Sequence, residues 1–342
     1  MANNNQEHTQ LTAKDFKSDQ EVRWCPGCGD HAIMNAIQRA LPEMNIPREK
    51  FAFISGIGCS SRFPYYMNTY GFHGIHGRAS AIASGTKTAN PDLSVWQITG
   101  DGDSMAIGGN HLIHTVRRNV DINIIIFNNE IYGLTKGQYS PTSKYGAVTK
   151  TSPYGTIENP FHPGELVIGA QGKFFARSVD INMKLNQEIF LEAEKHKGTA
   201  VVELLQNCVI YNDKAHAVIA DKKNKDERQL VLRHGEPMIF GKNRDKGIVL
   251  EGLKLKVVEI GKDGYTEDDI LVHDAKTPDP GIHLMLANMQ YPDYPVAVGI
   301  IRSVDADTYD HKMEEQIKQV REQSEFNCVD DLLNSGSTWE VK

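Results

Sequence analysis

The sequence lacks any long apolar run. Its most apolar stretch, Ile122–Phe127, is far shorter than the roughly 20 residues that a helix needs to cross a bilayer. The polar N-terminal segment, with asparagine at positions 3–5, also lacks the apolar region of a signal peptide or anchor. We therefore expect a cytoplasmic protein without a membrane partner, in which residues 1–22 form a flexible tail.

The chain also lacks an excess of positive charge and has few cysteines. Its formal net charge is −7 at pH 7, so no basic stripe is expected for nucleic acid. Five cysteines in 342 residues, without a secretory signal, argue against a disulfide framework. Metal, cluster and catalytic roles remain open for them. The hydrophobic and charged fractions, 40% and 24%, are typical of a globular chain.

What the sequence does contain is an alternation of glycine-rich turns, β-branched runs and helical patterns from Trp24 to Asn212. This alternation predicts an α/β fold with a doubly wound, mostly parallel sheet. We expect buried strands at Phe51–Ser55, Leu93–Thr99, Ile122–Phe127 and Ala200–Gln206. Apolar residues at three- and four-residue spacing predict helices at Asp30–Leu41, Ser104–Arg118 and Asn186–His196.

Two further regions are predicted from composition. Prolines, serines, threonines and glycines between Tyr139 and Pro163 indicate a long ordered loop. Beyond residue 220 the chain becomes more charged, with short strand patterns near Met238–Phe240 and Leu253–Ile260. We therefore divide the chain into the tail, a main domain at 23–220, and a C-terminal extension at 221–342 that packs on the main domain or on a partner.

Polar residues follow two neighbouring strands of the predicted sheet. Asp101 lies in a Gly-Asp-Gly turn after one strand, and Asn129 follows the next. A right-handed crossover brings the carboxyl ends of both strands to one edge, so these side chains should face one crevice. Gly-Asp-Gly alone is usually only a turn. With Asn129, it offers one anionic and one neutral oxygen, which suit a Mg²⁺ ion bridging diphosphate oxygens.

Four cysteines occupy loops at the same expected edge. Cys25 and Cys28 open the first helix, Cys59 follows the first strand, and Cys208 follows the last predicted strand of the main domain. Four thiolates suit either zinc or an iron–sulfur cluster, and their spacing alone does not separate the two. Cys328 lies in the extension and is better interpreted as a free cysteine.

Six motifs, in order between residues 20 and 220, carry a family resemblance. They are Trp24-Cys-Pro-Gly-Cys-Gly-Asp30, Gly56-Ile-Gly-Cys-Ser-Ser-Arg62, His76-Gly-Arg78, Gly100-Asp-Gly-Asp103, Tyr132-Gly-Leu-Thr-Lys-Gly-Gln138 and Gln206-Asn-Cys208. Together they resemble the β subunits of 2-oxoacid:ferredoxin oxidoreductases, in particular the 2-oxoglutarate (2-oxoglutarate synthase) branch. The Gly-Asp-Gly segment and Asn129 also resemble the thiamine-diphosphate motif that these enzymes share with transketolases and 2-oxoacid decarboxylases.

The resemblance implies a cofactor set and residues for it. Mg²⁺ would be bound by the side chains of Asp101 and Asn129 and by the carbonyl of Ile131. A [4Fe–4S] cluster would be held by Cys25, Cys28, Cys59 and Cys208. Contacts to thiamine diphosphate would come from Ile57, Gly58, Cys59, Ser60, His76, Gly102, Asp103, Gly133 and Leu134.

The resemblance also implies the reaction and the partners. A 2-oxoacid is decarboxylated oxidatively, the acyl group passes to coenzyme A, and the cluster carries electrons singly to ferredoxin. The glutamate that activates thiamine has no recognisable counterpart here, so we expect an α subunit to supply it in an (αβ)₂ assembly. A dicarboxylic substrate needs a cation for its far carboxylate, and Arg62 is the candidate. We therefore expect 2-oxoglutarate to be converted to succinyl-CoA and CO₂, or the reverse.

Three alternatives remain at this stage. The same chemistry could act on pyruvate or on a broader set of 2-oxoacids. A thiamine decarboxylase without redox chemistry would have no use for four clustered cysteines. A non-catalytic scaffold carrying zinc or a cluster belongs to a different class, and a visible absorption spectrum with thiamine analysis would distinguish it.

Overall fold

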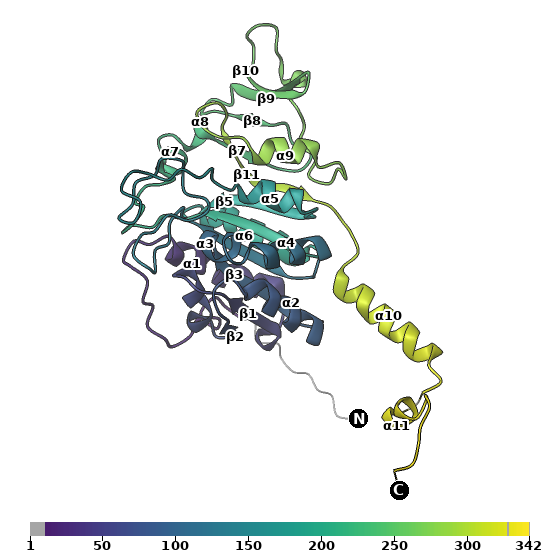
Figure 1. The fold of residues 1–342 in the computed structure, drawn as a ribbon. Helices are drawn as coiled ribbons and strands as arrows, with labels where there is room; N and C mark the ends of the chain where they lie inside the picture. Colours follow the sequence, from purple (N-terminus) through teal and green to yellow (C-terminus); the bar gives the residue numbers. More distant parts are fainter. Residues whose placement is uncertain (1–10, 327, 342) are drawn as a thin grey trace.

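The computed structural model describes residues 11–326 and 328–341 and is built around one eight-stranded sheet (Figure 1). The strand order is β2-β1-β3-β4-β6-β5-β11-β7. Neighbouring strands are parallel except β5 and β11, which are antiparallel. The bounds are β1 Phe51–Ser55, β2 Tyr70–His73, β3 Ser94–Gly100, β4 Asn123–Asn128, β5 Phe174–Val179, β6 Ala200–Leu205, β7 Gln229–Leu232 and β11 Val296–Ser303. The predicted doubly wound, mostly parallel α/β fold is confirmed.

Helices cover both faces of this sheet. On one face lie α1 (Asp30–Ala40) and α6 (Met183–Lys195); on the other lie α2 (Ala79–Ala89), α4 (Gly109–Arg118), α5 (Pro163–Gly169) and α9 (Gly281–Ala287). Successive residues of β4 alternate between the two apolar layers. Ile124 and Ile126 pack with α4, whereas Ile125 and Phe127 pack with α1 and α6. Burial on both faces explains why this strand is continuously apolar.

The shorter elements complete the chain. They are α3 Asp101–Met105, α7 Ala217–Ala220, α8 Lys225–Arg228, α10 Tyr309–Gln323 and α11 Val329–Leu333, with 3₁₀ turns at Leu41–Met44, Arg48–Lys50, Ser60–Tyr66 and Glu267–Asp269. A second sheet has the antiparallel order β10-β9-β8, formed by β8 Ile239–Phe240, β9 Lys246–Glu251 and β10 Lys254–Glu259. No helix in the described ranges is long and apolar enough to span a membrane.

The predicted helix Ser104–Arg118 is in fact two helices. The break lies at Ala106, whose ψ of −110° is not helical, and at Gly108. A β-carbon on Gly108 would lie 2.3 Å from the Asp103 carbonyl oxygen. The apolar periodicity of Ser104–Arg118 does not reveal this close approach of two backbone segments. The prediction of one continuous helix was therefore wrong, because Ser104 and Met105 end α3 and residues 106–108 lead into α4.

Several strands were not predicted, for physical reasons that differ. β2 is a short edge strand whose residues are all exposed, so it carries no apolar pattern. β5 is fully buried, but it contains Arg177, whose charge interrupts the apolar run. β7 and β11 lie beyond residue 220, in the part that we predicted to be an extension.

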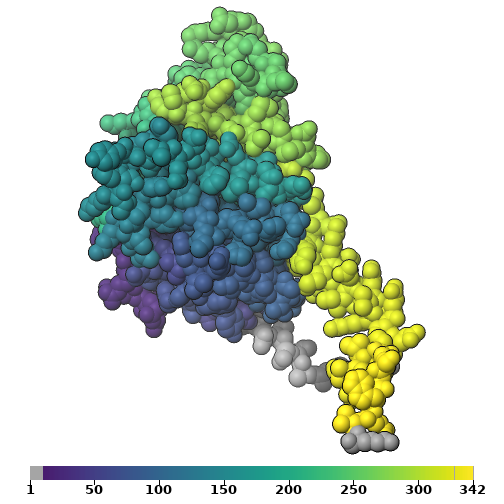
Figure 2. Space-filling view, viewed as in Figure 1, coloured from purple at the N-terminus to yellow at the C-terminus, as the bar shows by residue number. Residues whose placement is uncertain are grey.

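The C-terminal part is therefore not separate from the main sheet. β7 and β11 form one end of it, while the small sheet stands beyond that end (Figure 1). Within the described residues, α10, α11 and the segment after α11 extend away from the body, as Figure 2 shows in yellow. At the other terminus, residues 11–22 are packed rather than free, because Phe16 is fully buried against Phe51. Residues 1–10 of the predicted tail lie outside the described residues.

Candidate active site

The carboxyl ends of β1, β3 and β4 meet at one edge of the sheet and border a cavity of about 550 Å³. The residues that the sequence predicts for Mg²⁺ and thiamine diphosphate line this cavity: Ile57, Gly58, Cys59, Ser60, His76, Asp101, Gly102, Asp103, Asn129, Ile131, Gly133 and Leu134. They come from loops far apart in the sequence, which the parallel strands bring to one edge. We call this space the diphosphate cavity.

Asp101 directly follows β3 and has only 2% of its surface exposed. Its Oδ2 atom accepts hydrogen bonds from the hydroxyl groups of Ser140, at 2.5 Å, and Thr142, at 2.6 Å. Burial raises the pKa of Asp101, while these two donors lower it. A buried carboxylate that is held by neutral donors is a suitable ligand for a hard divalent cation such as Mg²⁺.

The other predicted metal ligands lie in a tight turn after β4. The Asn129 side chain accepts a hydrogen bond from the Ile131 amide at 3.2 Å, and Glu130 between them has a left-handed φ of 57°. Two side chains hold this turn from outside. Ser143 Oγ donates to the Glu130 carbonyl at 2.5 Å, and Asn212 Nδ2 donates to the Asn129 carbonyl at 2.9 Å. The amide oxygen of Asn129 therefore belongs to a well-fixed segment.

Two glycines explain why the loops can approach so closely. A β-carbon on Gly102 would lie 2.2 Å from the Tyr132 ring, whose hydroxyl donates to the Gly102 carbonyl at 3.0 Å. Burial raises the pKa of Tyr132 to about 12, so this hydroxyl keeps its proton. Gly58 has a φ of 137°, and no protein atom lies within 4 Å of the place of its missing β-carbon. It therefore leaves open space on the wall of the diphosphate cavity.

Asp103, which the sequence predicts to bind the cofactor, is already engaged by protein donors. Its Oδ1 accepts from the amides of Ile57, at 3.1 Å, and Gly77, at 2.7 Å. The same oxygen lies 2.8 Å from His76 Nδ1, and Oδ2 accepts from Thr99 Oγ1 at 2.7 Å. Its carboxylate therefore joins three loops and orients the His76 ring, rather than offering free lone pairs to a ligand.

A second cavity, of about 250 Å³, adjoins the first. It is lined by the four cysteines Cys25, Cys28, Cys59 and Cys208 and by Arg62, and it shares Cys59, Asn129, Gly133 and Leu134 with the diphosphate cavity. We call it the cysteine cavity. In the described ranges, no three His, Cys, Asp or Glu side chains lie close enough together for a single metal ion.

The environment of these thiols suits a buried group. Burial raises the pKa of Cys59 to about 11 and raises that of Cys28 still further, so both thiols are protonated in the absence of a cation. Gln206 Nε2 lies 3.2 Å from the Cys28 sulfur. A β-carbon on Gly133 would lie 3.5 Å from the Cys59 sulfur and 3.6 Å from that of Cys208. The peptide backbone thus passes directly beside two sulfurs, where glycine leaves the most room.

Arg62 lies with the cysteines and does not border the diphosphate cavity. Its amide donates to the Cys59 carbonyl at 3.2 Å, at the start of the 3₁₀ segment Ser60–Tyr66. Cys328 precedes α11 and is exposed. It does not line the cysteine cavity.

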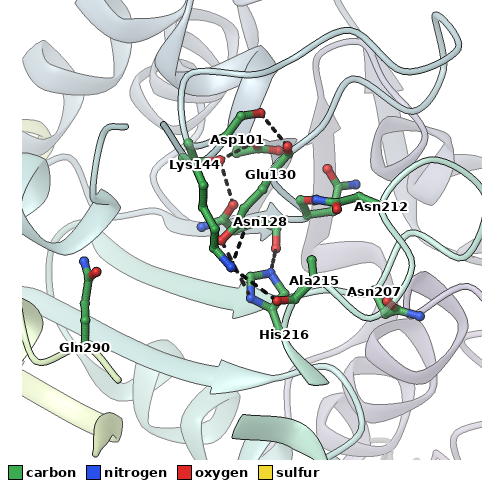
Figure 3. A network of polar contacts seen from close by, with 12 residues as sticks. Asp101, Asn128, Glu130, Lys144, Asn207, Asn212, Ala215, His216 and Gln290 are labelled. Carbon is green, nitrogen blue, oxygen red and sulfur yellow. Dashed lines mark hydrogen bonds and ion pairs between the residues drawn. The ribbon is translucent and has the colours of Figure 1, made fainter. Parts of the chain in front are cut away.

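Sequence reasoning missed a third cavity, of about 260 Å³, behind the end of β4. Figure 3 shows Glu130, Lys144 and His216 gathered there beside Asn128. Burial raises the pKa of Glu130 to about 7 and lowers that of His216 to about 4. His216 Nε2 lies 2.9 Å from the Asn128 carbonyl. The acidic Glu130 between the two predicted metal ligands was the signal available in the sequence.

Comparisons with known proteins agree with this geometry. Residues 56–204 match the family described as thiamine pyrophosphate enzyme, C-terminal TPP binding domain. The chain is 48% identical over 332 residues to the 2-oxoglutarate oxidoreductase subunit KorB of Mycobacterium tuberculosis. The aligned residues cover 96% of this chain and 88% of that protein. It is 43% identical over 185 residues to the 2-oxoglutarate synthase subunit KorB of Archaeoglobus fulgidus, covering 54% of this chain and 69% of the relative.

A solved structure is similar over nearly the whole chain. It is the 2-oxoglutarate:ferredoxin oxidoreductase from Magnetococcus marinus with 2-oxoglutarate, coenzyme A and succinyl-CoA bound. The TM-score is 0.76 at 32% sequence identity, covering 96% of this chain and 97% of that one. The β subunit of 2-oxoacid:ferredoxin oxidoreductase 1 from Aeropyrum pernix is 45% identical over 198 residues, which span 62% of that relative.

Proposed function

This chain belongs to the KorB family of 2-oxoglutarate:ferredoxin oxidoreductase β subunits, and from this premise we propose how its two adjoining cavities carry out the reaction of that enzyme. The enzyme converts 2-oxoglutarate and coenzyme A to succinyl-CoA and CO₂, and passes two electrons to ferredoxin, or runs in reverse. One observation supports this assignment above the others. Residues expected to bind a thiamine cofactor and residues expected to bind a cluster line two cavities with a common wall.

In the diphosphate cavity we assign Mg²⁺ to Asp101, Asn129 and the Ile131 carbonyl. The donor set fits, because it offers one buried carboxylate and neutral oxygens from segments that the protein already holds in place. The diphosphate would lie against Gly58, where the absence of a side chain leaves open space, whereas Gly102 lets the Tyr132 ring pack closely beside it. When bound, thiamine diphosphate supplies the electron sink for the bond broken as CO₂ leaves.

In the cysteine cavity we assign a [4Fe–4S] cluster to Cys25, Cys28, Cys59 and Cys208. Four thiols border one space of about 250 Å³. Burial keeps the Cys28 and Cys59 thiols protonated, so binding the cluster would require these two to lose their protons. Because Cys59 borders both cavities, a cluster bound to it would lie next to the thiamine cofactor. Such proximity suits the transfer of electrons one at a time.

For the substrate we retain Arg62 as the proposed partner of the distal carboxylate of 2-oxoglutarate. A guanidinium group binds a carboxylate through two parallel hydrogen bonds. Pyruvate has no second carboxylate and so cannot form these bonds with Arg62. The position of Arg62 in the cysteine cavity requires the substrate to approach along the shared wall.

For the assembly, we propose an α subunit as the obligatory partner, in an (αβ)₂ complex, with coenzyme A as co-substrate. The test is to purify the α and β chains together without oxygen. We expect thiamine diphosphate, iron and sulfide to be bound, and 2-oxoglutarate to reduce ferredoxin or a viologen only when coenzyme A is present. Zinc in place of iron, with no bound thiamine, would instead identify the non-catalytic scaffold.

A further inference from the structure

The two predicted metal-ligand segments are held together by side chains that the reaction does not use. Ser140, Thr142 and Ser143 lie in the long loop that follows β4, and each is at most 5% exposed. None of the three borders the diphosphate cavity. They therefore act on that cavity only through other residues.

The three hydroxyl groups contact both metal-ligand segments. Those of Ser140 and Thr142 donate to the same oxygen of Asp101, at 2.5 and 2.6 Å. That of Ser143 donates at 2.5 Å to the carbonyl of Glu130, the residue between Asn129 and Ile131. Ser143 Oγ also accepts a hydrogen bond from the Ser140 amide at 2.8 Å, and this bond connects the two ends of the segment 140–143. One short loop segment thus joins the residue after β3 to the turn after β4.

A buried ion pair supports this loop segment from behind. Arg177 Nε lies 2.7 Å from Glu203 Oε2, and the two side chains are 7% and 2% exposed. Glu203 Oε1 accepts from Asn128 Nδ2 at 2.8 Å, so the oxygen of that amide faces Thr142 Oγ1, 2.9 Å away. Figure 3 shows Asn128 beneath Asp101 and beside Glu130. The position of Thr142 is therefore fixed from two sides.

We propose that Ser140, Thr142 and Ser143 form a clasp that sets the position of Asp101 relative to Asn129 and Ile131, and so determines the affinity of the site for Mg²⁺. These are positioning residues, because they contact the metal ligands and not the metal. Both clasp hydroxyls near Asp101 bind Oδ2 and leave Oδ1 without a hydroxyl donor. These two hydrogen bonds thereby fix the orientation of the carboxylate about its Cβ–Cγ bond. Partners that orient metal ligands commonly contribute about 10- to 100-fold to metal affinity.

This inference rests on the proposed function, and its test separates the two. The αβ complex is stripped with EDTA, and binding of thiamine diphosphate is then measured by equilibrium dialysis against increasing Mg²⁺. Thr142→Val keeps the shape of the side chain but removes the donor, and Thr142→Ser restores the donor. Thr151→Val is the matched control, because Thr151 is exposed on the same loop. Iron content and melting temperature are recorded for each variant.

For Thr142→Val, we expect the Mg²⁺ concentration at half-saturation to rise about 10- to 100-fold, with iron content retained. Thr142→Ser should stay close to the wild type, as should Thr151→Val. If Thr142→Val binds Mg²⁺ like the wild type, or if it loses iron and Mg²⁺ together, the clasp is refuted while the proposed function stands. A wild-type complex that binds no thiamine diphosphate with Mg²⁺ would refute both.

Discussion

At the scale of single residues, Asp101 provides the negative charge on which Mg²⁺ binding depends. It is the one anionic side chain that we assign to the ion. Asp101→Ala should therefore leave the αβ complex without stoichiometric thiamine diphosphate after gel filtration in Mg²⁺, while the iron content is unchanged. Asp92→Ala is the matched control, since Asp92 is exposed and its one ion pair among the described residues is with the exposed Lys50, at 3.5 Å. Full retention of the cofactor by Asp101→Ala would show that the metal assignment is wrong.

Each of the four cysteines of the cysteine cavity should be required for binding iron and sulfide. Changing any of Cys25, Cys28, Cys59 or Cys208 to serine replaces a soft thiolate ligand, so we expect iron and acid-labile sulfide to be lost. Cys328→Ser should keep both, because Cys328 is exposed and lies outside the cavity. Iron and sulfide analysis after anaerobic purification makes the measurement. Loss of iron in the Cys328 variant would require a different ligand set.

Arg62 provides a test of substrate choice. Removing a charge-assisted hydrogen bond of ~1.5 to 3 kcal/mol should reduce kcat/KM about tenfold to more than a hundredfold. In Arg62→Leu we expect this reduction for 2-oxoglutarate and little change for pyruvate, in viologen-coupled assays of the complex. An equal reduction for both substrates would mean that Arg62 supports the cysteine cavity that it lines.

At the scale of elements, the break between α3 and α4 depends on one of two adjacent glycines. A β-carbon on Gly108 would lie 2.3 Å from the Asp103 carbonyl, whereas one on Gly109 would meet no atom within 4 Å. Gly108→Ala should therefore lower stability by ~1 to 3 kcal/mol through overpacking. Gly109→Ala, at the first residue of α4, should raise it by ~0.4 to 1 kcal/mol because it restricts the unfolded chain. Melting temperatures of the two complexes should shift in opposite directions; shifts of the same sign would contradict this account.

The same segment shows how far the sequence determines the site. The crossover between β3 and β4 could be predicted, because buried parallel strands are continuously apolar and their ends meet at one edge. That rule placed Asp101 and Asn129 together. The positions of Ser140 and Thr142 could not be predicted, because they depend on the path of a long loop without periodicity. Arg177 was missed for a related reason, since a buried charge in β5 resembles a loop residue until its partner Glu203 is located.

At the scale of the whole molecule, the sheet serves two cavities from one edge. Cys59 follows β1 and borders both, while Asn129, Gly133 and Leu134 after β4 form the rest of the common wall. The C-terminal strands β7 and β11 form the opposite end of the sheet. This end supports the site indirectly, because Arg177 of β5 also donates to the Ala287 carbonyl of α9 at 3.0 Å. A change in the C-terminal half can therefore reach Asp101 through a chain of contacting groups.

The composition of the diphosphate cavity predicts that this subunit does not act alone. Its lining, within the described residues, contains two aspartates and one histidine but no glutamate. Activation of thiamine requires an acid beside the pyrimidine ring, and the carboxylates of Asp101 and Asp103 are engaged by other groups. The isolated β subunit should therefore release no labelled CO₂ from 2-oxoglutarate carrying ¹⁴C at the carboxyl group next to the ketone, even with Mg²⁺ and thiamine diphosphate added. Adding the α subunit should produce release, and EDTA treatment should abolish it. Release by the β subunit alone, above the level of the Asp101→Ala variant, would place the missing acid within this chain.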